Sequence, residues 1–167
     1  ISYFKEVKIP VRIVATDLVR GEPVVFDSGR LGFAVRASMA IPGLFAPIKY
    51  KDKILVDGRV SNPVPDDVVK AMGADIVIAV NLDNFQGQKL FGENNLSLNK
   101  VAMRSAEVMR HYLSQYSIKN ADIIIQPKLK KYSSWRGYFM GDVGGEIVRI
   151  GAEETEQFIP QIKKLIA

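Results

Sequence analysis

The segment Ala74–Leu82 constrains the fold more than any other part of this chain, because its apolar side chains would point to both faces of a strand. A strand that is apolar on both faces is typical of the centre of a parallel sheet. Val11–Thr16 and Ala121–Pro127 are similarly rich in β-branched and apolar residues. Such strands need helices to cover the sheet, so this pattern favours an α/β fold.

Helical patterns and short strands alternate along the chain. A short helix is expected over Leu31–Ala40, a second between Pro63 and Gly73, and a long one from Asn99 onward. Pro160 should kink or restart the last helix. We therefore predict a three-layer αβα architecture with a mostly parallel central sheet.

The long helix after Asn99 carries an apolar stripe that alternates steps of four and three residues. We expect this stripe to be the buried face of the helix. Its members are Ala102, Ala106, Met109, Leu113 and Tyr116.

Composition excludes several classes of site. The 167 residues contain no cysteine and one histidine, which excludes disulfides, a cysteine nucleophile, thiolate zinc sites and histidine-based metal sites. We expect no metal and no cofactor. The run Ile76–Val80 is far shorter than the ~20 apolar residues of a membrane span. A chain of this length favours one domain.

The net charge of +5 permits attraction to anionic lipid or nucleic acid. The basic cluster lies within Lys128–Arg136 and is interleaved with aromatic residues. Such clusters are usually solvated faces, but this one could also contact an anionic membrane. No specific motif supports base stacking, and we expect no nucleic-acid partner.

Two aspartates follow predicted strands, where functional groups of parallel sheets collect. Asp57 ends the strand that begins at Lys53, and its carboxylate could deprotonate or orient a nucleophile. The Asp-Gly dipeptide could equally well only close a turn. Asp17 leaves the same two alternatives, and the nearby Gly21 favours a turn.

Other candidate catalytic features are weaker. His111 lies beside the apolar stripe of its helix, where we expect an exposed residue, so a Ser-His-Asp triad is not expected. No serine has glycine two residues before and two residues after it, so a nucleophile elbow is absent from these residues. The glycines between Gly141 and Gly145 could hold an anion or act as a linker.

The ordered segments of the chain resemble the C-terminal half of a bacterial patatin-like phospholipase. The resemblance covers essentially the whole chain, and several motifs in the same order are more specific than any one of them. The motifs are Ile9–Leu18, Gly21-Glu22, Arg36–Phe45, Leu55–Pro65, Gly73–Val80, Arg104-Ser105, Ala121–Gln126-Pro127 and the terminal helix.

This resemblance implies a lipid acyl hydrolase that uses a Ser–Asp dyad without histidine. Asp57 would be the dyad carboxylate, at the position of the family's Asp-Gly-Gly or Asp-Gly-Ala motif, and would take the proton from the serine hydroxyl. Residues 1–167 would form the C-terminal portion of a single patatin-like domain, an incomplete patatin-like fold. The oxyanion loop and the Gly-x-Ser-x-Gly motif would precede Ile1, so the isolated chain is expected to be inactive.

Five further residues are expected to contribute to such a site. Leu44 and Phe45 could line an acyl-chain channel, or they could pack in the core. Gly58, Arg59 and Asn62 would support the loop that holds the aspartate. Arg59 departs from the small residue that the family has at this position.

The resemblance also implies partners. The substrate would be a lipid or another acyl ester, and the chain would pair with the missing N-terminal half or associate with itself. We expect a location in the cytoplasm or at a membrane surface, with possible peripheral contact to anionic lipid. The alternative function is a non-catalytic lipid-binding or scaffold domain of the same fold.

Overall fold

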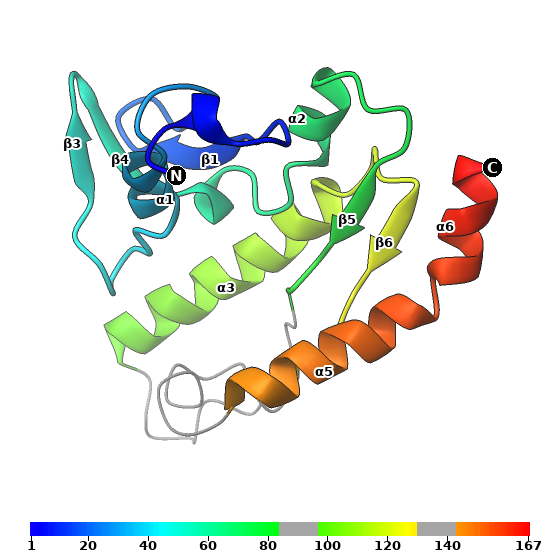
Figure 1. Cartoon of the computed structure of the whole chain (residues 1–167). Coiled ribbons are helices and arrows are strands. Elements are labelled where there is room, and N and C mark those ends of the chain that lie inside the picture. Colours follow the sequence, from blue (N-terminus) through cyan, green and yellow to red (C-terminus); the bar gives the residue numbers. More distant parts are fainter. Residues whose placement is uncertain (84–96, 130–142) are drawn as a thin grey trace.

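The α/β class is confirmed by a computed structural model, which describes residues 1–83, 97–129 and 143–167 (Figure 1). Four strands form one sheet in the order β2-β1-β4-β3, and two form a second sheet, β5-β6. The first sheet comprises β1 (Ile13–Asp17), β2 (Glu22–Phe26), β3 (Ile48–Tyr50) and β4 (Lys53–Asp57).

The four-stranded sheet is antiparallel throughout, which corrects our prediction of a mostly parallel central sheet. The cause lies in the connections. A turn at Gly21 joins β1 to β2, and Lys51 and Asp52 join β3 to β4. Such short connections can link only antiparallel neighbours, whereas a parallel pair needs a long crossover. Gly21 and Lys51 both have positive φ, at 71° and 54°, as tight turns often require.

The one parallel pair within the described residues is β5 (Ile78–Val80) with β6 (Ile123–Ile125). The long helix α3 (Leu98–Tyr116) lies between these strands in the chain, so it forms part of the crossover. Ala79 of β5 is buried, as are Ile123 and Ile125 of β6, whereas Ile78, Val80 and Ile124 are at least 37% exposed. Ala79 is the register partner of Ile124, so on each face of the pair one strand is buried and the other is exposed. The predicted strand Ala74–Leu82 is therefore shortened to β5 and is buried on one face only.

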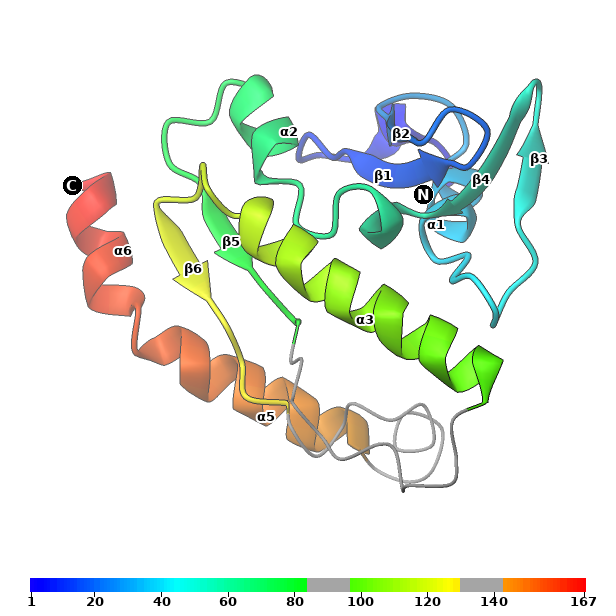
Figure 2. The same ribbon diagram turned by 180° about the vertical axis from the view of Figure 1, so that it is seen from behind.

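Four of the remaining helices match the predicted segments. They are α1 (Leu31–Ser38), α2 (Asp66–Ala71) and the pair α5 (Val143–Glu156) and α6 (Ile159–Ile166). Pro160 stands in the first turn of α6, so it restarts the helix as the sequence predicts. Figure 2 shows α5 and α6 as two separate helices that meet at an angle. Two short 3-10 helices, η1 (Phe4–Glu6) and η2 (Gly58–Val60), complete the described elements.

The core of the four-stranded sheet lies between the sheet and α1. Ala15, Ala37 and Leu55 are fully buried there. Phe33 of α1 packs against Phe26 and Tyr50, with ring centroids 5.9 and 5.0 Å away. This packing fixes β4 against β1, and β4 carries Asp57 at its carboxyl end.

Helix α3 packs in the opposite sense from the one we predicted. Its one fully buried residue is Ser114, whereas Met109 and Tyr116 of the predicted buried stripe are each 66% exposed. The polar side of α3 therefore faces the rest of the described structure, and its apolar side faces outward. Among the described helices, none has the length and hydropathy needed to cross a membrane.

Candidate functional site

Asp57 lies at the end of β4 and is only 9% exposed. Its main-chain N–H donates to the carbonyl of Ala40 at 3.0 Å, next to the end of α1. Its carboxylate Oδ1 accepts the main-chain N–H of Arg59 at 2.9 Å, which caps the start of η2. Asp57 therefore has the turn-closing role that the Asp-Gly dipeptide suggested, and it also presents a second carboxylate oxygen.

The turn that follows Asp57 rests directly on β1. The Thr16 hydroxyl donates to the carbonyl oxygen of Asp57 at 3.0 Å and lies 2.8 Å from the hydroxyl of Ser61. Gly58 is buried against the main chain of Val14, where no side chain would fit. These contacts hold the backbone on both sides of Asp57 and so fix the position of its side chain.

Burial raises the pKa of the Asp57 carboxyl above its ordinary value. The Arg59 N–H and the positive charges of Arg59 and Arg110 act in the opposite direction, but burial outweighs them. A carboxyl with a raised pKa is a stronger base than an exposed aspartate, which suits proton transfer near neutral pH.

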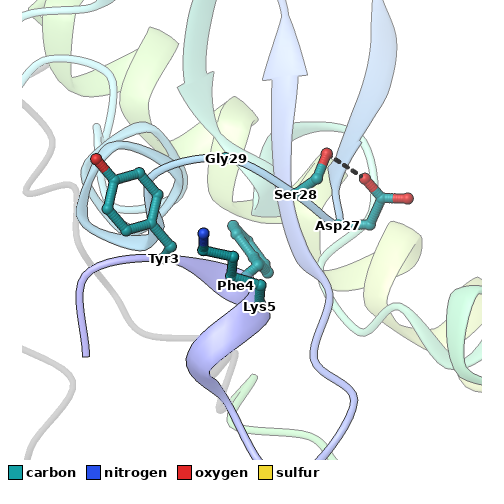
Figure 3. A pocket seen from close by; sticks show the side chains of 6 residues that line it. All are labelled: Tyr3, Phe4, Lys5, Asp27, Ser28 and Gly29. Atoms are coloured by element: carbon teal, nitrogen blue, oxygen red, sulfur yellow. Dashed lines mark hydrogen bonds between the residues drawn. The ribbon is translucent and has the colours of Figure 1, made fainter.

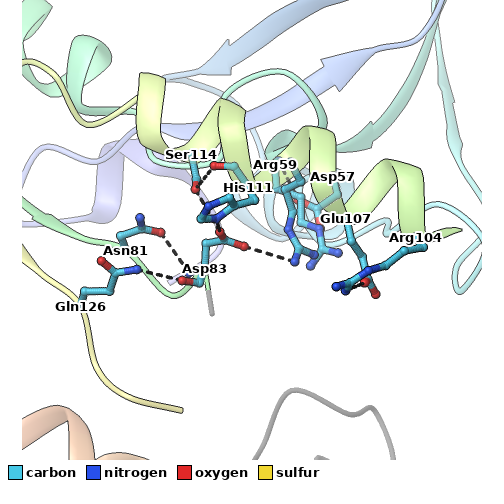
Figure 4. A network of polar contacts seen from close by, with 10 residues as sticks. Asp57, Arg59, Asn81, Asp83, Arg104, Glu107, His111, Ser114 and Gln126 are labelled. Atoms are coloured by element: carbon cyan, nitrogen blue, oxygen red, sulfur yellow. Dashed lines mark hydrogen bonds and ion pairs between the residues drawn. The ribbon is translucent and has the colours of Figure 1, made fainter. Parts of the chain in front are cut away.

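A second aspartate, Asp83, follows β5 and is the centre of a polar cluster with α3 (Figure 4). Its side chain is 5% exposed and accepts from Arg110 at 3.2 Å. The His111 ring nitrogen Nδ1 lies 2.6 Å from the same carboxylate, and the Ser114 hydroxyl donates to it at 3.3 Å. Beyond β6, the Gln126 amide donates to the Asp83 carbonyl at 2.9 Å. We call Asp83, Arg110, His111 and Ser114 the Asp83 cluster.

The Asp83 cluster is not a Ser-His-Asp relay. In such a relay the imidazole stands between the serine and the aspartate. Here the Ser114 hydroxyl donates to the Asp83 carboxylate itself and to the main-chain carbonyl of His111 at 2.8 Å. The cluster ties α3 to the ends of the parallel strands, which is a structural role.

The contacts of α3 side chains with Asp83 were not predicted from the sequence. His111 was expected to be exposed, but its side chain is 30% exposed and contacts Asp83, because the polar face of α3 packs inward. The signal is present in the sequence as polar residues at steps of three and four. They are Arg104, Glu107, His111 and Ser114, which Figure 4 shows along one side of the helix.

The positive charge of Arg110 couples the Asp83 cluster to Asp57. Arg110 of α3 pairs with Asp83, and its positive charge also opposes the rise that burial causes in the pKa of Asp57. Arg59 of η2 lies with its Nε 3.9 Å from Asp57 Oδ2. Burial, together with the charge of Arg110, lowers the pKa of Arg59 below its ordinary value. The negative charges of Asp57, Asp83 and Glu107 act in the opposite direction but do not outweigh burial.

The other predicted site residues have different surroundings. Leu44 and Phe45 are 45% and 44% exposed, so they are not core residues. The Asn62 main-chain N–H donates to the Gly58 carbonyl at 2.8 Å and so supports the Asp57 turn. The Asn62 side chain instead donates to Asp67 at 2.8 Å, toward α2.

Asp17 is a structural residue. Its buried carboxylate accepts the N–H of Val19 at 3.0 Å, a guanidinium N–H of Arg20 at 3.1 Å and the ammonium of Lys53 at 3.4 Å. Burial raises the pKa of Asp17, but these hydrogen bonds together lower it below its ordinary value. Of the two roles that the sequence allowed for Asp17, a functional carboxylate or a residue that closes a turn, these contacts support the second.

Three further features do not enter the site. A pocket between η1 and the turn before α1 is lined by residues of both segments, and neither Asp57 nor Asp83 contributes to it (Figure 3). The part of the basic cluster from 130 to 136, and Gly141, lie outside the described residues. In the described ranges, no group of three His, Asp or Glu side chains could hold a metal ion.

Comparison with known proteins relates about half of the chain to one group of proteins. No protein-family model matches the chain. An NTE family protein of Mycobacterium tuberculosis is 42% identical over 79 residues, which cover 47% of this chain and 22% of that protein. A second NTE family protein of the same organism is 38% identical over 80 residues, which cover 47% of this chain and 14% of that protein.

A mammalian protein shows the same similarity. Patatin-like phospholipase domain-containing protein 7 of Rattus norvegicus is 37% identical over 76 residues, which cover 44% of this chain and 6% of that protein. The matches span less than a quarter of the length of these relatives. The chain therefore has homologues among proteins named as NTE family and patatin-like phospholipase domain-containing proteins.

Proposed function

We propose that this chain is the aspartate-bearing part of a patatin-like lipid acyl hydrolase, with Asp57 as the catalytic base. The proposal depends mainly on one observation, which is a largely buried carboxylate at the end of a strand with one oxygen left for a reaction partner. Asp57 Oδ1 is held by the Arg59 N–H, whereas Oδ2 accepts no hydrogen bond within the described residues.

The nucleophile in this proposal is a serine supplied by polypeptide outside residues 1–167. Its hydroxyl oxygen attacks the ester carbonyl carbon while Asp57 takes the hydroxyl proton. The tetrahedral intermediate expels the alcohol, which leaves with that proton, and an acyl-serine remains. Water then attacks the acyl-serine with Asp57 again as base, releasing the carboxylic acid and restoring the serine.

The substrate is proposed to be a lipid or another acyl ester. Leu44 and Phe45 are exposed apolar residues on the segment between α1 and β3, where they could contact an acyl chain. The net charge of +5 favours peripheral contact with an anionic membrane. The homologues named as phospholipases support a lipid substrate class.

The test is Asp57→Asn in the full-length protein, assayed with a short p-nitrophenyl ester. Loss of the base should lower kcat by roughly 100- to 10,000-fold. Asp27→Asn is the matched control, because Asp27 is exposed and its side chain accepts a hydrogen bond only from its neighbour Ser28 among the described residues. The Asp27→Asn variant should hydrolyse the ester at the wild-type rate.

Two outcomes would contradict the proposal. If Asp57→Asn retains wild-type turnover, Asp57 has no part in the reaction. If the full-length protein hydrolyses no ester and has no serine in a Gly-x-Ser-x-Gly motif, the chain belongs instead to a non-catalytic lipid-binding or scaffold domain.

A further inference from the structure

Arg59 approaches both carboxylate oxygens of Asp57, one with its main chain and the other with its side chain. Its main-chain N–H donates to Oδ1 at 2.9 Å. Its side chain places Nε 3.9 Å from Oδ2. The first contact is a hydrogen bond, which any residue except proline could supply. The second is too long for a hydrogen bond, so it acts through charge.

The guanidinium of Arg59 pairs with Asp57. It makes no hydrogen bond to any described residue, and Asp57 is the one ion-pair partner that the structure gives it. By contrast, Arg110 is held by Asp83 at 3.2 Å and Arg104 by Glu107 at 2.8 Å. Because Arg59 is only 39% exposed at its side chain, its charge is less screened by water than that of a surface arginine.

Few charged groups act on Asp57 besides Arg59. From α3, Arg110 also favours the ionised carboxylate. From β1, the neighbour of the Asp57 turn is the uncharged Thr16. The acidic groups Asp83 and Glu107 act on the charge of Arg59. Arg59 therefore supplies the nearest positive charge to a carboxylate that burial would otherwise favour in its protonated, inactive form.

We propose that Arg59 is a positioning residue for Asp57, whose main-chain N–H fixes the orientation of the carboxylate and whose guanidinium keeps it ionised at the moment it must accept a proton. This inference rests on the proposed function of Asp57 as a base. It assigns a role to the position where the chain departs from the glycine or alanine of the resembling motif.

The first experiment compares pH profiles of kcat/KM for a short p-nitrophenyl ester in the full-length protein. Arg59→Gln keeps the main-chain N–H and removes the charge. The midpoint of the acid limb should move to higher pH by roughly one pH unit, because more base is then needed to ionise Asp57. Arg59→Lys keeps the charge, so its midpoint should stay nearer to the wild-type value.

Arg149→Gln is the matched control for the loss of one positive charge. Arg149 lies on α5 and pairs with Glu153 at the surface, at 2.6 Å. Its acid limb should coincide with that of the wild type. If Arg59→Gln and Arg149→Gln have the same acid limb, or if Arg59→Lys shifts as far as Arg59→Gln, the proposal is overturned.

A second measurement separates this inference from the proposed function. The Asp57 carboxyl can be titrated by NMR in full-length protein with ¹³C-labelled aspartate, with Asp57→Asn identifying its signal. The titration midpoint should rise in Arg59→Gln and stay constant in Arg149→Gln, even if the protein hydrolyses no ester. An unchanged midpoint in Arg59→Gln would refute the role of Arg59, whereas a shifted midpoint without hydrolysis would refute only the proposed function.

Discussion

Gly58 lies so close to Val14 that a Cβ atom at position 58 would stand 2.3 Å from the Val14 carbonyl oxygen and 2.8 Å from its carbonyl carbon. The obstacle is the main chain of a central strand, which cannot move aside like a flexible side chain. Glycine is therefore required directly after Asp57 for a steric reason, and the Asp-Gly pair is a unit of the fold as well as of the site.

We predict that Gly58→Ala destabilises the protein by about 1–3 kcal/mol, because the added methyl group must displace β1 or the Asp57 turn. Thermal or urea unfolding measures the change. Gly151→Ala is the control, since Gly151 lies inside α5 with no atom within 4 Å of an added Cβ. It should stabilise the protein by about 0.5–1 kcal/mol. Equal stability of the two variants would contradict the steric argument.

Asp57 should lower the stability of the fold at neutral pH. Its pKa is raised above the ordinary value of 3.8 in the folded protein, so the folded state holds the proton more tightly than the unfolded state. The free energy of unfolding therefore falls as pH rises through the interval between these two values and stays lowered above it. Asp57→Asn should raise Tm at pH 7 and leave it nearly unchanged near pH 3.

Asp17→Asn should change Tm at pH 7 in the opposite direction from Asp57→Asn. The pKa of Asp17 is lowered in the folded protein, so its ionised form stabilises the fold above the unfolded-state pKa, and that stability is lost as pH falls through the folded-state value. Asp17→Asn should therefore lower Tm at pH 7. If both variants shift Tm in the same direction at pH 7, the electrostatic account of one of them is wrong.

The outward face of α3 should drive self-association of the isolated 167 residues. Leu98, Met109, Tyr112 and Tyr116 share this face by their helical spacing and are each at least 66% exposed. An exposed apolar stripe of this kind is typical of a surface that contacts another chain. Size-exclusion chromatography should show a species larger than a monomer, and Met109→Lys should shift it toward the monomer.

Met103→Lys is the control for this surface, because Met103 is 67% exposed on the same helix but lies off the stripe. It should elute like the unmodified chain. A monomer that unfolds cooperatively without any substitution would count against both the stripe and the expected pairing with a missing half.

Most strand segments and helices could be predicted from sequence, because apolar runs, glycine turns and prolines act locally. Pro160 and the strand that ends at Asp57 are examples. Strand direction could not, since a β-branched run such as Ile13–Asp17 has the same pattern in a parallel and in an antiparallel sheet. Strand direction depends on the connections, and no pattern in the sequence predicted β3 at Ile48–Tyr50, the first strand of a hairpin.

In the candidate site too, local features could be predicted from the sequence, whereas contacts between distant segments could not. The position of Asp57 followed from its place after a strand, but the charge of Arg110, which also acts on it, comes from a helix far along the chain. The apolar spacing of α3 predicted the wrong inward face, because the contacts that fix this helix are polar and converge on Asp83. A hydrophobic pattern identifies an apolar face without stating what covers it, and here the described residues leave that face open.

The arrangement of the two sheets has a consequence for the order of folding during synthesis. All pairing in the antiparallel sheet lies between residues 13 and 57, and two of its three pairings are closed by local turns. The β5–β6 pairing joins Ile78 to Ile123, so it must wait for a much longer stretch of chain. Contacts that are local in sequence form faster than distant ones. The nascent chain should therefore complete the Asp57 turn on the ribosome before the strand that anchors Asp83 has a partner.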